Sequence, residues 1–569
     1  MLRSLPVRCL SLASRTPSRL LHAFPASLWN SRLMSSVANG KSSRQTQTEE
    51  VPTGGMIGAE WLSTDDESAL GFTRSLVGGD WVEAREGAKL PVEDPANGEV
   101  IAMVGDLSRS DISRAVEAAS DAFPKWSAVS CKRRAEILHK WFSLMAERRE
   151  VLARTMAREN GKPYAEALGE MAYAGAFVEW FAEEARRSYG ETIPTPVSDK
   201  RLLTIKQPVG VCGMITPWNF PAAMITRKVA AALAAGCTCV VKPSELTPLT
   251  ALALAKLAEE AGVPPGVINV VVTSDAKAAG DVLCGDPRVK KISFTGSTRV
   301  GKLLARQAQE NVKRVSLELG GNAPFIVFED ADIEEAVNGL MASKFRGSGQ
   351  TCVCANRIFV HKNIFLDFTM KLVQAVEKLK LGHGLTEGTT TGPLINAAAV
   401  RKVQDMVDDA VAKGAQLLTG GSSIQLAAWA DGRRKEGAGT KGHFFEPTVI
   451  DMREVPRDSG CRLLNEEIFG PVAPLFSFED SQEVIQKANE TNSGLAAYFF
   501  TSNVHRVFGV SEALQSGMVG VNTGIVSHVE APFGGVKESG VGREGSKHGI
   551  DEYLQLKYIC MGSMKAEVP

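Results

Sequence analysis

The chain has 569 residues, of which 44% are hydrophobic and 23% charged, and its 64 basic and 65 acidic side chains leave a net charge of −1 at pH 7. This length and composition exclude a mainly disordered, collagenous or membrane-embedded protein. The balanced charge, with no basic patch interleaved with aromatic residues, argues against nucleic acid as a partner. No apolar run reaches membrane length, because Arg227 and Lys228 interrupt the best candidate.

The N-terminal segment differs in charge from the rest of the chain. Residues 1–48 hold six Arg, one Lys and ten Ser, and no acidic side chain. Such a composition is typical of a mitochondrial presequence, with a plain disordered tail as the alternative. A secretory signal is excluded because Arg15 and Arg19 interrupt its apolar core. We therefore predict a mitochondrial matrix protein in which residues 1–58 are a presequence and a flexible segment.

The ten cysteines are scattered, with no Cys-x-x-Cys pair, and the histidine spacing shows no zinc pattern. This distribution suits free thiols in a reducing compartment and predicts no metal site.

The first predicted elements are helices. Ser108 can cap a helix over 108–123, in which apolar and small side chains recur at helical spacing. Helical periodicity continues over 132–160, where Gly161 provides a stop, and over 166–187.

From residue 209 onward, strand and helix patterns alternate. Short apolar runs alternate with Ala-rich helices, two of which end at a glycine. The predicted elements are strand 210–216, helix 222–235, strand 238–241, helix 250–261, strand 267–272, strand 289–295 and helix 302–309. This alternation implies a parallel sheet with helices on both faces.

A second α/β region begins near Gly320. Its predicted elements are strands 325–328, 357–361 and 472–476 and helices 365–379 and 397–413. Residues 422–442 are rich in Gly and charge and are predicted to form an irregular surface loop. Two strand-like segments, 202–207 and 553–561, fit neither region.

Two glycine-containing segments are candidates for binding or catalysis. Residues 294–301, FTGSTRVG, follow a strand and open a helix, so they form either a phosphate site or an ordinary tight turn. Residues 345–354, FRGSGQTCVC, place Cys352 in a polar, Gly-rich loop. That thiol is either a nucleophile or a buried structural cysteine.

Two polar side chains in apolar surroundings complete the candidates. Asn219 lies between two prolines in TPWNFP, where its amide is either an oxyanion donor or a plain turn residue. Glu318 lies in the apolar strand VSLELGG, where it is either a general base of raised pKa or a residue on an exposed strand face.

Taken together, six motifs resemble those of the aldehyde dehydrogenase superfamily, in the family's order: TPWNFP, VKPSE, FTGST, LELGG, GQTC and EEIFGPV. The resemblance covers the chain from about residue 61 to the C-terminus and is strongest to members that oxidise succinate semialdehyde. One departure is Gly347, where many relatives carry Asn.

The resemblance implies three catalytic residues. Cys352 would attack the aldehyde, Asn219 and the Cys352 N–H would hold the oxyanion, and Glu318 would activate the water that hydrolyses the thioester. A non-catalytic binding protein on the same fold is the alternative of another class, and the presence of all three residues argues against it.

The resemblance also implies a nicotinamide cofactor. Lys242 and Glu245 would bind the adenosine ribose, Ser297 the pyrophosphate, and Glu467 with Phe469 the nicotinamide ribose. The full expected set is Thr216, Pro217, Trp218, Lys242, Ser244, Glu245, Gly296, Ser297, Glu467 and Phe469. Because the Glu245 carboxylate would repel a 2′-phosphate, we expect NAD, with NADP as the alternative.

For the substrate, the resemblance implies that Arg227, Arg346 and Ser527 anchor a distal carboxylate. The expected reaction is oxidation of succinate semialdehyde to succinate in 4-aminobutyrate degradation, with glutarate semialdehyde as the alternative substrate. From the residues alone, Arg227 could be a solvated helix charge and Arg346 part of a loop salt bridge.

Cys354 lies two residues beyond Cys352. In an extended loop both thiols could point the same way, so a reversible disulfide could switch the enzyme off. A second buried thiol is the alternative interpretation.

The expected fold class is α/β, with a Rossmann-type cofactor domain, an α/β catalytic domain and a small bridging β element. We assign 59–189 and 207–317 to the first, 318–530 to the second, and 190–206 and 531–569 to the bridging strands. Exposed bridging strands invite pairing with another subunit, and the resemblance implies a homotetramer.

Overall fold

The structure is a computed structural model that describes residues 72–85, 87–424, 429–430, 433–434 and 442–563. The predicted presequence lies outside these residues.

The first sheet has a parallel core with a reversal in strand order. Its strands run in the order β2 (Asp80–Val82), β1 (Ser75–Val77), β9 (Ile268–Val270), β8 (Thr238–Lys242), β7 (Val211–Ile215), β10 (Val289–Thr295), β11 (Arg314–Glu318) and β25 (Gly540–Val541). The five strands from β9 to β11 are parallel. The chain order reverses between β7 and β10, which is the doubly wound arrangement of Rossmann-type domains. The predicted parallel sheet is confirmed.

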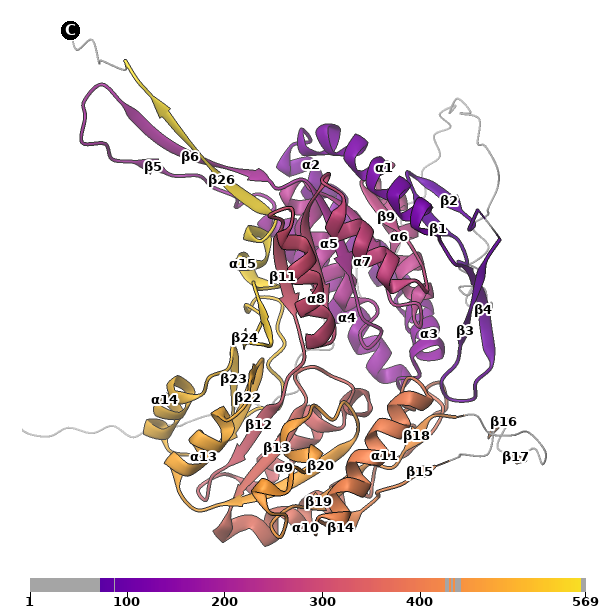
Figure 1. The fold of residues 1–569 in the computed structure, drawn as a ribbon, viewed down its shortest axis with the longest axis vertical. Coiled ribbons are helices and arrows are strands. Elements are labelled where there is room, and N and C mark those ends of the chain that lie inside the picture. The colour runs from indigo at the N-terminus through magenta and orange to yellow at the C-terminus, as the bar shows by residue number, and fades with distance from the viewer. Residues whose placement is uncertain (1–71, 86, 425–428, 431–432, 435–441, 564–569) are drawn as a thin grey trace, which may run out of the picture. The chain divides into compact units, whose positions relative to one another are not determined.

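Helices cover both faces of this sheet (Figure 1). One face packs against α2 (Cys131–Glu147), α3 (Arg149–Asn160), α4 (Tyr164–Glu184), α5 (Ala223–Ala235) and α6 (Pro248–Ala261). The other packs against α1 (Arg109–Ser127), α7 (Ala276–Gly285) and α8 (Thr298–Gln309). Neighbouring strand residues alternate between the two faces, so Val240 joins one core cluster and Val241 the other. Ser108 caps α1 as predicted, and α5 and α6 end at glycines with φ of 95° and 99°.

The predicted single helix over 132–160 is wrong in one respect. The structure divides it at Arg148, whose φ of −106° and ψ of 18° end α2 before α3 begins. No Gly or Pro marks the break, and both halves keep an apolar face toward the core, so the periodicity gave no sign of it.

The second sheet also has a mainly parallel core. Its order is β14 (Gln416–Thr419), β19 (Thr448–Asp451), β20 (Val472–Phe478), β13 (Ala355–His361), β12 (Ala323–Val327), β22 (Ala496–Phe500) and β23 (Met518–Val521), with β14 antiparallel to its neighbour. Phe325 faces α9 (Ile333–Lys344) and α10 (Phe365–Val376), while Ile326 faces α13 (Ser481–Asn489) and α14 (Val504–Ala513). A further cluster packs under α11 (Ala397–Ala412). The two α/β regions confirm the predicted fold class.

The two strands that fitted neither region pair with each other. β6 (Arg201–Pro208) and β26 (Leu554–Met561) are antiparallel over eight residues each, and β5 (Thr192–Ile193) adds a third strand. Figure 1 shows this three-stranded arm projecting beyond α15 (Ser546–Asp551). The segment 531–569 also supplies β25 to the first sheet.

The segment 422–442 is less irregular than predicted, because short antiparallel pairs form in it. β15 (Ser423–Ile424) pairs with β18 (Phe444–Phe445), and β16 (Trp429–Ala430) pairs with β17 (Arg433–Arg434). Other parts of it lie outside the described residues.

The remaining short elements are β3 (Lys89–Glu93), β4 (Val100–Gly105), β21 (Ser493–Gly494), β24 (Val536–Lys537), α12 (Arg462–Asn465) and the 3₁₀ turns Arg346–Gly349, Lys362–Ile364 and Arg457–Ser459.

Across the described part of the chain, every helix is too short or too polar to cross a bilayer.

The packing of the second sheet predicts the effect of a core deletion. Phe325 is fully buried, with its ring centroid 5.1 Å from that of Phe500. We expect Phe325→Ala to lower the free energy of unfolding by about 3–5 kcal/mol, because it leaves a cavity. The matched control is Phe508→Ala on α14, whose side chain is 65% exposed. Equal midpoints for the two variants in urea denaturation would contradict this packing.

Candidate active site

The carboxyl ends of four parallel strands form one edge of the first sheet. Thr216 follows β7, Lys242 ends β8, Gly296 follows β10 and Glu318 ends β11. Backbone hydrogen bonds connect neighbouring segments at this edge. The Thr216 N–H donates to the Lys242 carbonyl (3.1 Å), and the Gly296 N–H donates to the Glu318 carbonyl (3.0 Å). In doubly wound sheets, ligands bind at this edge near the reversal in strand order. The expected cofactor segments therefore meet where this topology places a dinucleotide.

The local chemistry at this edge fits the adenosine and phosphate part of a dinucleotide. Lys242 donates to the half-exposed carboxylate of Glu245 (2.7 Å), which leaves that carboxylate accessible to ribose hydroxyls. Ser297 caps the N-terminus of α8, where free backbone N–H groups favour an anion. Thr295 Oγ1 at the end of β10 is buried and has no hydrogen-bond partner among the described residues. Ser244, by contrast, accepts a hydrogen bond from the backbone N–H of Leu246 (3.2 Å).

A second part of the expected cofactor site comes from the other sheet. Trp218, which follows Pro217, packs edge-to-face against Phe469 with ring centroids 5.6 Å apart. Phe469 adopts a φ of 53°, which is unusual for a residue with a side chain. Glu467 accepts a hydrogen bond from the Gly321 N–H (3.1 Å), and burial raises its pKa to about 7.

A cavity of about 730 Å³ opens beside this glutamate, and its lining includes Thr298, Gly320, Gly321, Asn322 and Glu467. Close packing against the backbone requires Gly321, whereas a side chain at Gly320 would displace the Glu467 carboxylate. A Cβ on Gly321 would lie 2.5 Å from the carbonyl oxygen of Cys352, and one on Gly320 would lie 2.7 Å from Glu467 Oε2.

The candidate nucleophile lies in a tight turn. Gly347 and Ser348 both adopt left-handed conformations, with φ of 57° and 56°, which Gly and Asn accept readily. Cys352 as a whole residue is partly exposed, but the protein groups around its thiol remove most of the water that would solvate a thiolate. This desolvation raises the pKa of the thiol to about 12. The positive charge of Arg227 opposes the rise, and the negative charge of Glu318 adds to it.

Asn219 lies against the turn that carries Cys352. Its side-chain N–H donates to the Gln350 carbonyl (3.0 Å), which leaves the second N–H of the amide free of that bond. Lys162 donates to the Asn219 carbonyl (2.9 Å) and pairs with Glu170, both charges being buried. Glu170 in turn accepts the backbone N–H groups at the start of α5. The sequence analysis missed Lys162 and Glu170.

Glu318 is buried at the end of β11, so it does not lie on an exposed strand face. Its Oε2 has no hydrogen-bond partner in the described structure. Burial, and then the negative charge of Glu544, raise the pKa of Glu318 well above its ordinary value, while Lys228 and Arg227 oppose the rise. Glu544 forms ion pairs with both cations, at 3.4 Å from Arg227.

The three expected substrate residues gather around Tyr173. Arg227 is 3% exposed, which excludes a solvated helix charge, and its Nη2 donates to the Tyr173 hydroxyl (3.1 Å). Burial raises the pKa of the Tyr173 hydroxyl, and Arg227, the nearby Ser527 and the positive charge of Arg346 oppose that rise. Within the described residues, the Nε atoms of both arginines are buried without a partner. Two unpaired guanidinium N–H groups beside Cys352 suit an anionic group.

Tyr173 is a residue that sequence reasoning missed. It lies in the predicted helix 166–187, four residues before Phe177, against which its ring packs at 4.9 Å. That spacing is typical of a core-facing aromatic pair, so the pattern gave no indication of the hydroxyl's position.

The structure corrects the expected geometry around Cys354. The segment is a turn, closed by the Cys354 N–H donating to the Thr351 carbonyl (3.1 Å), and is not extended. Both thiols are free, and the buried Cys354 thiol lies 3.5 Å from the carbonyl oxygen of Lys344.

No group of three His, Cys, Asp or Glu side chains in the described ranges has the arrangement of a metal site.

Comparison with known proteins identifies the family. The family model "Aldehyde dehydrogenase family" matches residues 81–559. A glutarate-semialdehyde dehydrogenase of Pseudomonas putida is 53% identical, over 86% of this chain and 97% of its own. The mitochondrial succinate-semialdehyde dehydrogenase of Homo sapiens is 52% identical, over 87% and 90%. The crystal structure of an Escherichia coli NADP-dependent enzyme superposes with a TM-score of 0.82 at 52% identity, covering 86% of this chain and 98% of that one.

These matches agree with the two sheets and with the strand edge described above. The chain belongs to the aldehyde dehydrogenase family and is an aldehyde dehydrogenase that uses a nicotinamide cofactor.

Proposed function

We propose that the protein oxidises succinate semialdehyde to succinate with NAD, through a thioester on Cys352. The observation that carries the proposal is the pair of arginines whose charges act on Tyr173, the buried Arg227 and the half-buried Arg346, because the buried Nε atom of each has no hydrogen-bond partner among the described residues. Relatives that bear the names succinate- and glutarate-semialdehyde dehydrogenase support an aldehyde with a distal carboxylate.

In the proposed mechanism the Cys352 thiolate adds to the aldehyde carbon. Arg227 favours that thiolate, since its positive charge opposes the burial that raises the pKa of the thiol. The free N–H of the Asn219 amide and the Cys352 backbone N–H stabilise the oxyanion. As the oxyanion collapses to the thioester, the carbon loses its hydride, for which a bound nicotinamide would be the acceptor; Glu467 and Phe469 would hold that group.

The thioester on Cys352 is then hydrolysed. Glu318 takes a proton from water, whose oxygen attacks the thioester carbonyl, and Cys352 leaves as a thiolate while the carboxylic acid is released. Because burial and Glu544 raise the pKa of Glu318, this carboxylate is a stronger base than a solvated one.

This division of roles predicts different outcomes for two variants. We expect Glu318→Gln to form about one equivalent of NADH per site in a burst and then to turn over at least about 100-fold more slowly, because only hydrolysis is blocked. Cys352→Ala should show neither burst nor turnover. Both are measured by stopped-flow absorbance of NADH. A Glu318→Gln enzyme that retains normal steady-state turnover would contradict the assigned base.

The carboxylate pocket predicts a charge-dependent loss of binding. With succinate semialdehyde, Arg346→Ala should lose roughly 1.5–3 kcal/mol of substrate binding, because a charge-assisted hydrogen bond disappears. With butanal, which has the same carbon number and no carboxylate, the variant should resemble the wild type. The measurement is kcat/KM for both aldehydes. Equal losses for the two would refute the pocket.

Glutarate semialdehyde is the second candidate substrate, favoured by the relative of that name. It carries the same carboxylate one methylene farther from the aldehyde, and one methylene changes binding by about 1–3 kcal/mol in a fitted pocket. The same kcat/KM assay ranks the two semialdehydes.

The preference for NAD rests on Glu245. Its carboxylate accepts from Lys242, and its remaining lone pairs suit ribose hydroxyls but oppose a 2′-phosphate. Because the Escherichia coli structural relative is an NADP-dependent enzyme, the assay compares both cofactors.

A disulfide between Cys352 and Cys354 would block the nucleophile, and forming it requires the turn closed by the Cys354 N–H to open and the Cys354 thiol to leave the Lys344 carbonyl. We expect peroxide to inactivate the wild type reversibly, with recovery after reduction, because a sulfenic acid on one thiol condenses with the other. Cys354→Ala should inactivate more slowly or fail to recover. The matched control is Cys284→Ala, which removes a buried thiol in α7. Identical inactivation and recovery in Cys354→Ala and wild type would refute the switch.

We propose a mitochondrial matrix location and a homotetramer. The acid-free segment 1–48 and the mitochondrial relative support the first. The exposed side chains of the arm, such as Leu556 and Tyr558, support assembly through β26. Import into isolated mitochondria and analytical ultracentrifugation test the two proposals.

A further inference from the structure

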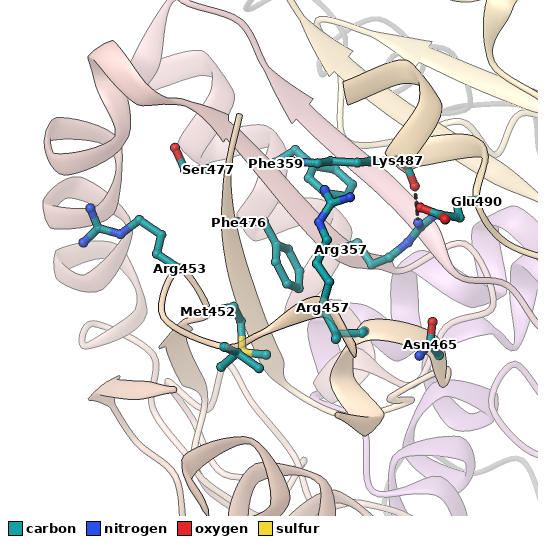
Figure 2. A pocket seen from close by; sticks show the side chains of 12 residues that line it. Arg357, Phe359, Met452, Arg453, Arg457, Asn465, Phe476, Ser477, Lys487 and Glu490 are labelled. Atoms are coloured by element: carbon teal, nitrogen blue, oxygen red, sulfur yellow. Dashed lines mark hydrogen bonds between the residues drawn. The ribbon is translucent and has the colours of Figure 1, made fainter. Parts of the chain in front are cut away.

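A separate cavity of about 470 Å³ lies against the second sheet (Figure 2). Phe359 on β13 and Phe476 on β20 form an apolar wall, with ring centroids 5.5 Å apart. Its polar lining comes from the same two strands, through Arg357 on β13 and Ser477 on β20, and from α13, the residue that follows it, and the segments after β19 and around α12. None of the predicted catalytic, cofactor or substrate residues lines it.

The charge in this cavity is unbalanced. Four lining side chains are cationic, Arg357, Arg453, Arg457 and Lys487, and Glu490 is the single acidic one. A site of this kind therefore presents an excess of positive charge beside an aromatic surface.

Arg357 is a buried cation whose hydrogen bonds within the described structure all go to backbone carbonyls. It is 4% exposed and donates two hydrogen bonds to the Asn322 carbonyl (3.2 and 3.0 Å) and one each to those of Lys487 (2.8 Å, dashed in Figure 2) and Ala488 (2.7 Å). A guanidinium has five N–H donors, so one remains. No ion pair with Arg357 forms among the described residues, although Glu490 lies near enough to oppose the lowering of its pKa by burial. A buried charge is normally compensated by an opposite one.

The other cations differ in their availability. Arg453 pairs with Asp451 (2.7 Å), and in Figure 2 it points away from Phe476. Lys487 pairs with Glu483. Arg457 is exposed and has no ion pair in the part of the chain that the structure describes, and its side chain extends beside Phe476 (Figure 2). Arg457 is thus the cation free to meet a ligand.

We propose that this cavity binds a small organic anion with a planar apolar body, its charge held by Arg457 and Arg357 and its body lying on Phe476. The volume is within the range of small-molecule sites, about 300–1,000 Å³. Phosphate monoesters and carboxylates share this chemistry, and Arg recognises both.

The cavity shares a wall with the active site. Asn322, held by Arg357, follows Gly321, whose N–H donates to Glu467 (3.1 Å). The amide of Asn322 donates to the carbonyl of Asn465 (3.3 Å), a residue that lines both cavities. An anion on Arg357 therefore acts on the segment that positions Glu467, and we expect its binding to alter cofactor affinity. This coupling rests on the proposed role of Glu467; the anion site itself does not.

The test is isothermal titration calorimetry of the intact protein with phenyl phosphate and with benzoate. We expect saturable binding of at least one of them, and no binding of neutral benzyl alcohol; the stronger of the two anions identifies the preferred head group. Arg457→Gln should weaken binding at least about tenfold, because a charge-assisted hydrogen bond is lost. Arg453→Gln, a lining arginine with its charge already paired, is the matched control and should stay within about twofold.

The proposal would be overturned if neither anion bound saturably, or if an anion bound wild type and Arg457→Gln with equal affinity. It would also be overturned if anion binding were lost in Arg346→Ala but kept in Arg457→Gln, because that result would place the probe in the substrate pocket. Cofactor affinity measured by nucleotide fluorescence at saturating probe tests the coupling, and an unchanged affinity would refute it. Catalytic activity enters none of these readouts, so a wrong substrate assignment would leave them intact.

Discussion

A run of five residues, Glu318–Asn322, joins the last parallel strand of the first sheet to the first strand of the second. The buried carboxylate of Glu318 lies at its start. Two glycines follow: the backbone of the Cys352 turn leaves no room for a Cβ on Gly321, and a Cβ on Gly320 would displace the side chain of Glu467. Asn322 at its end is held by the buried guanidinium of Arg357. Because this run is fixed at both ends and in the middle, it sets the relative positions of base, nucleophile and cofactor residues.

Buried charge is the second constraint, since each ionised group must find a partner within the protein. Lys162 is paired with Glu170, which also accepts the backbone N–H groups at the start of α5 and so helps to position the helix that carries Arg227. Glu544 takes the charges of Lys228 and Arg227. The candidate site is therefore stiffened by ion pairs that need not take part in the chemistry.

The sequence predicted those features that depend on local pattern. The strands of the first sheet were recognisable because a strand buried on both faces is a short apolar run. Cys352 was a candidate because it lies in a Gly-rich polar loop, but only the resemblance of six motifs to the aldehyde dehydrogenases favoured a nucleophile over a structural thiol. Tyr173 could not be predicted, because its role depends on contacts with residues more than 50 positions away. The break at Arg148 was equally hidden, since it leaves the helical period unchanged, and the turn at Cys354 depends on a single backbone hydrogen bond.

The arm formed by β6 and β26 has a consequence for the order of events during synthesis. Pro208 pairs with Leu554, and Arg201 with Met561, so β6 has no main partner until the last residues of the chain have been made. During translation the two α/β regions can begin to fold while β6 is paired only with the two residues of β5. A chain interrupted before residue 554 would therefore lack β26 and keep only the short pairing of β5 with β6, and any assembly through β26 would be restricted to subunits synthesised beyond that point.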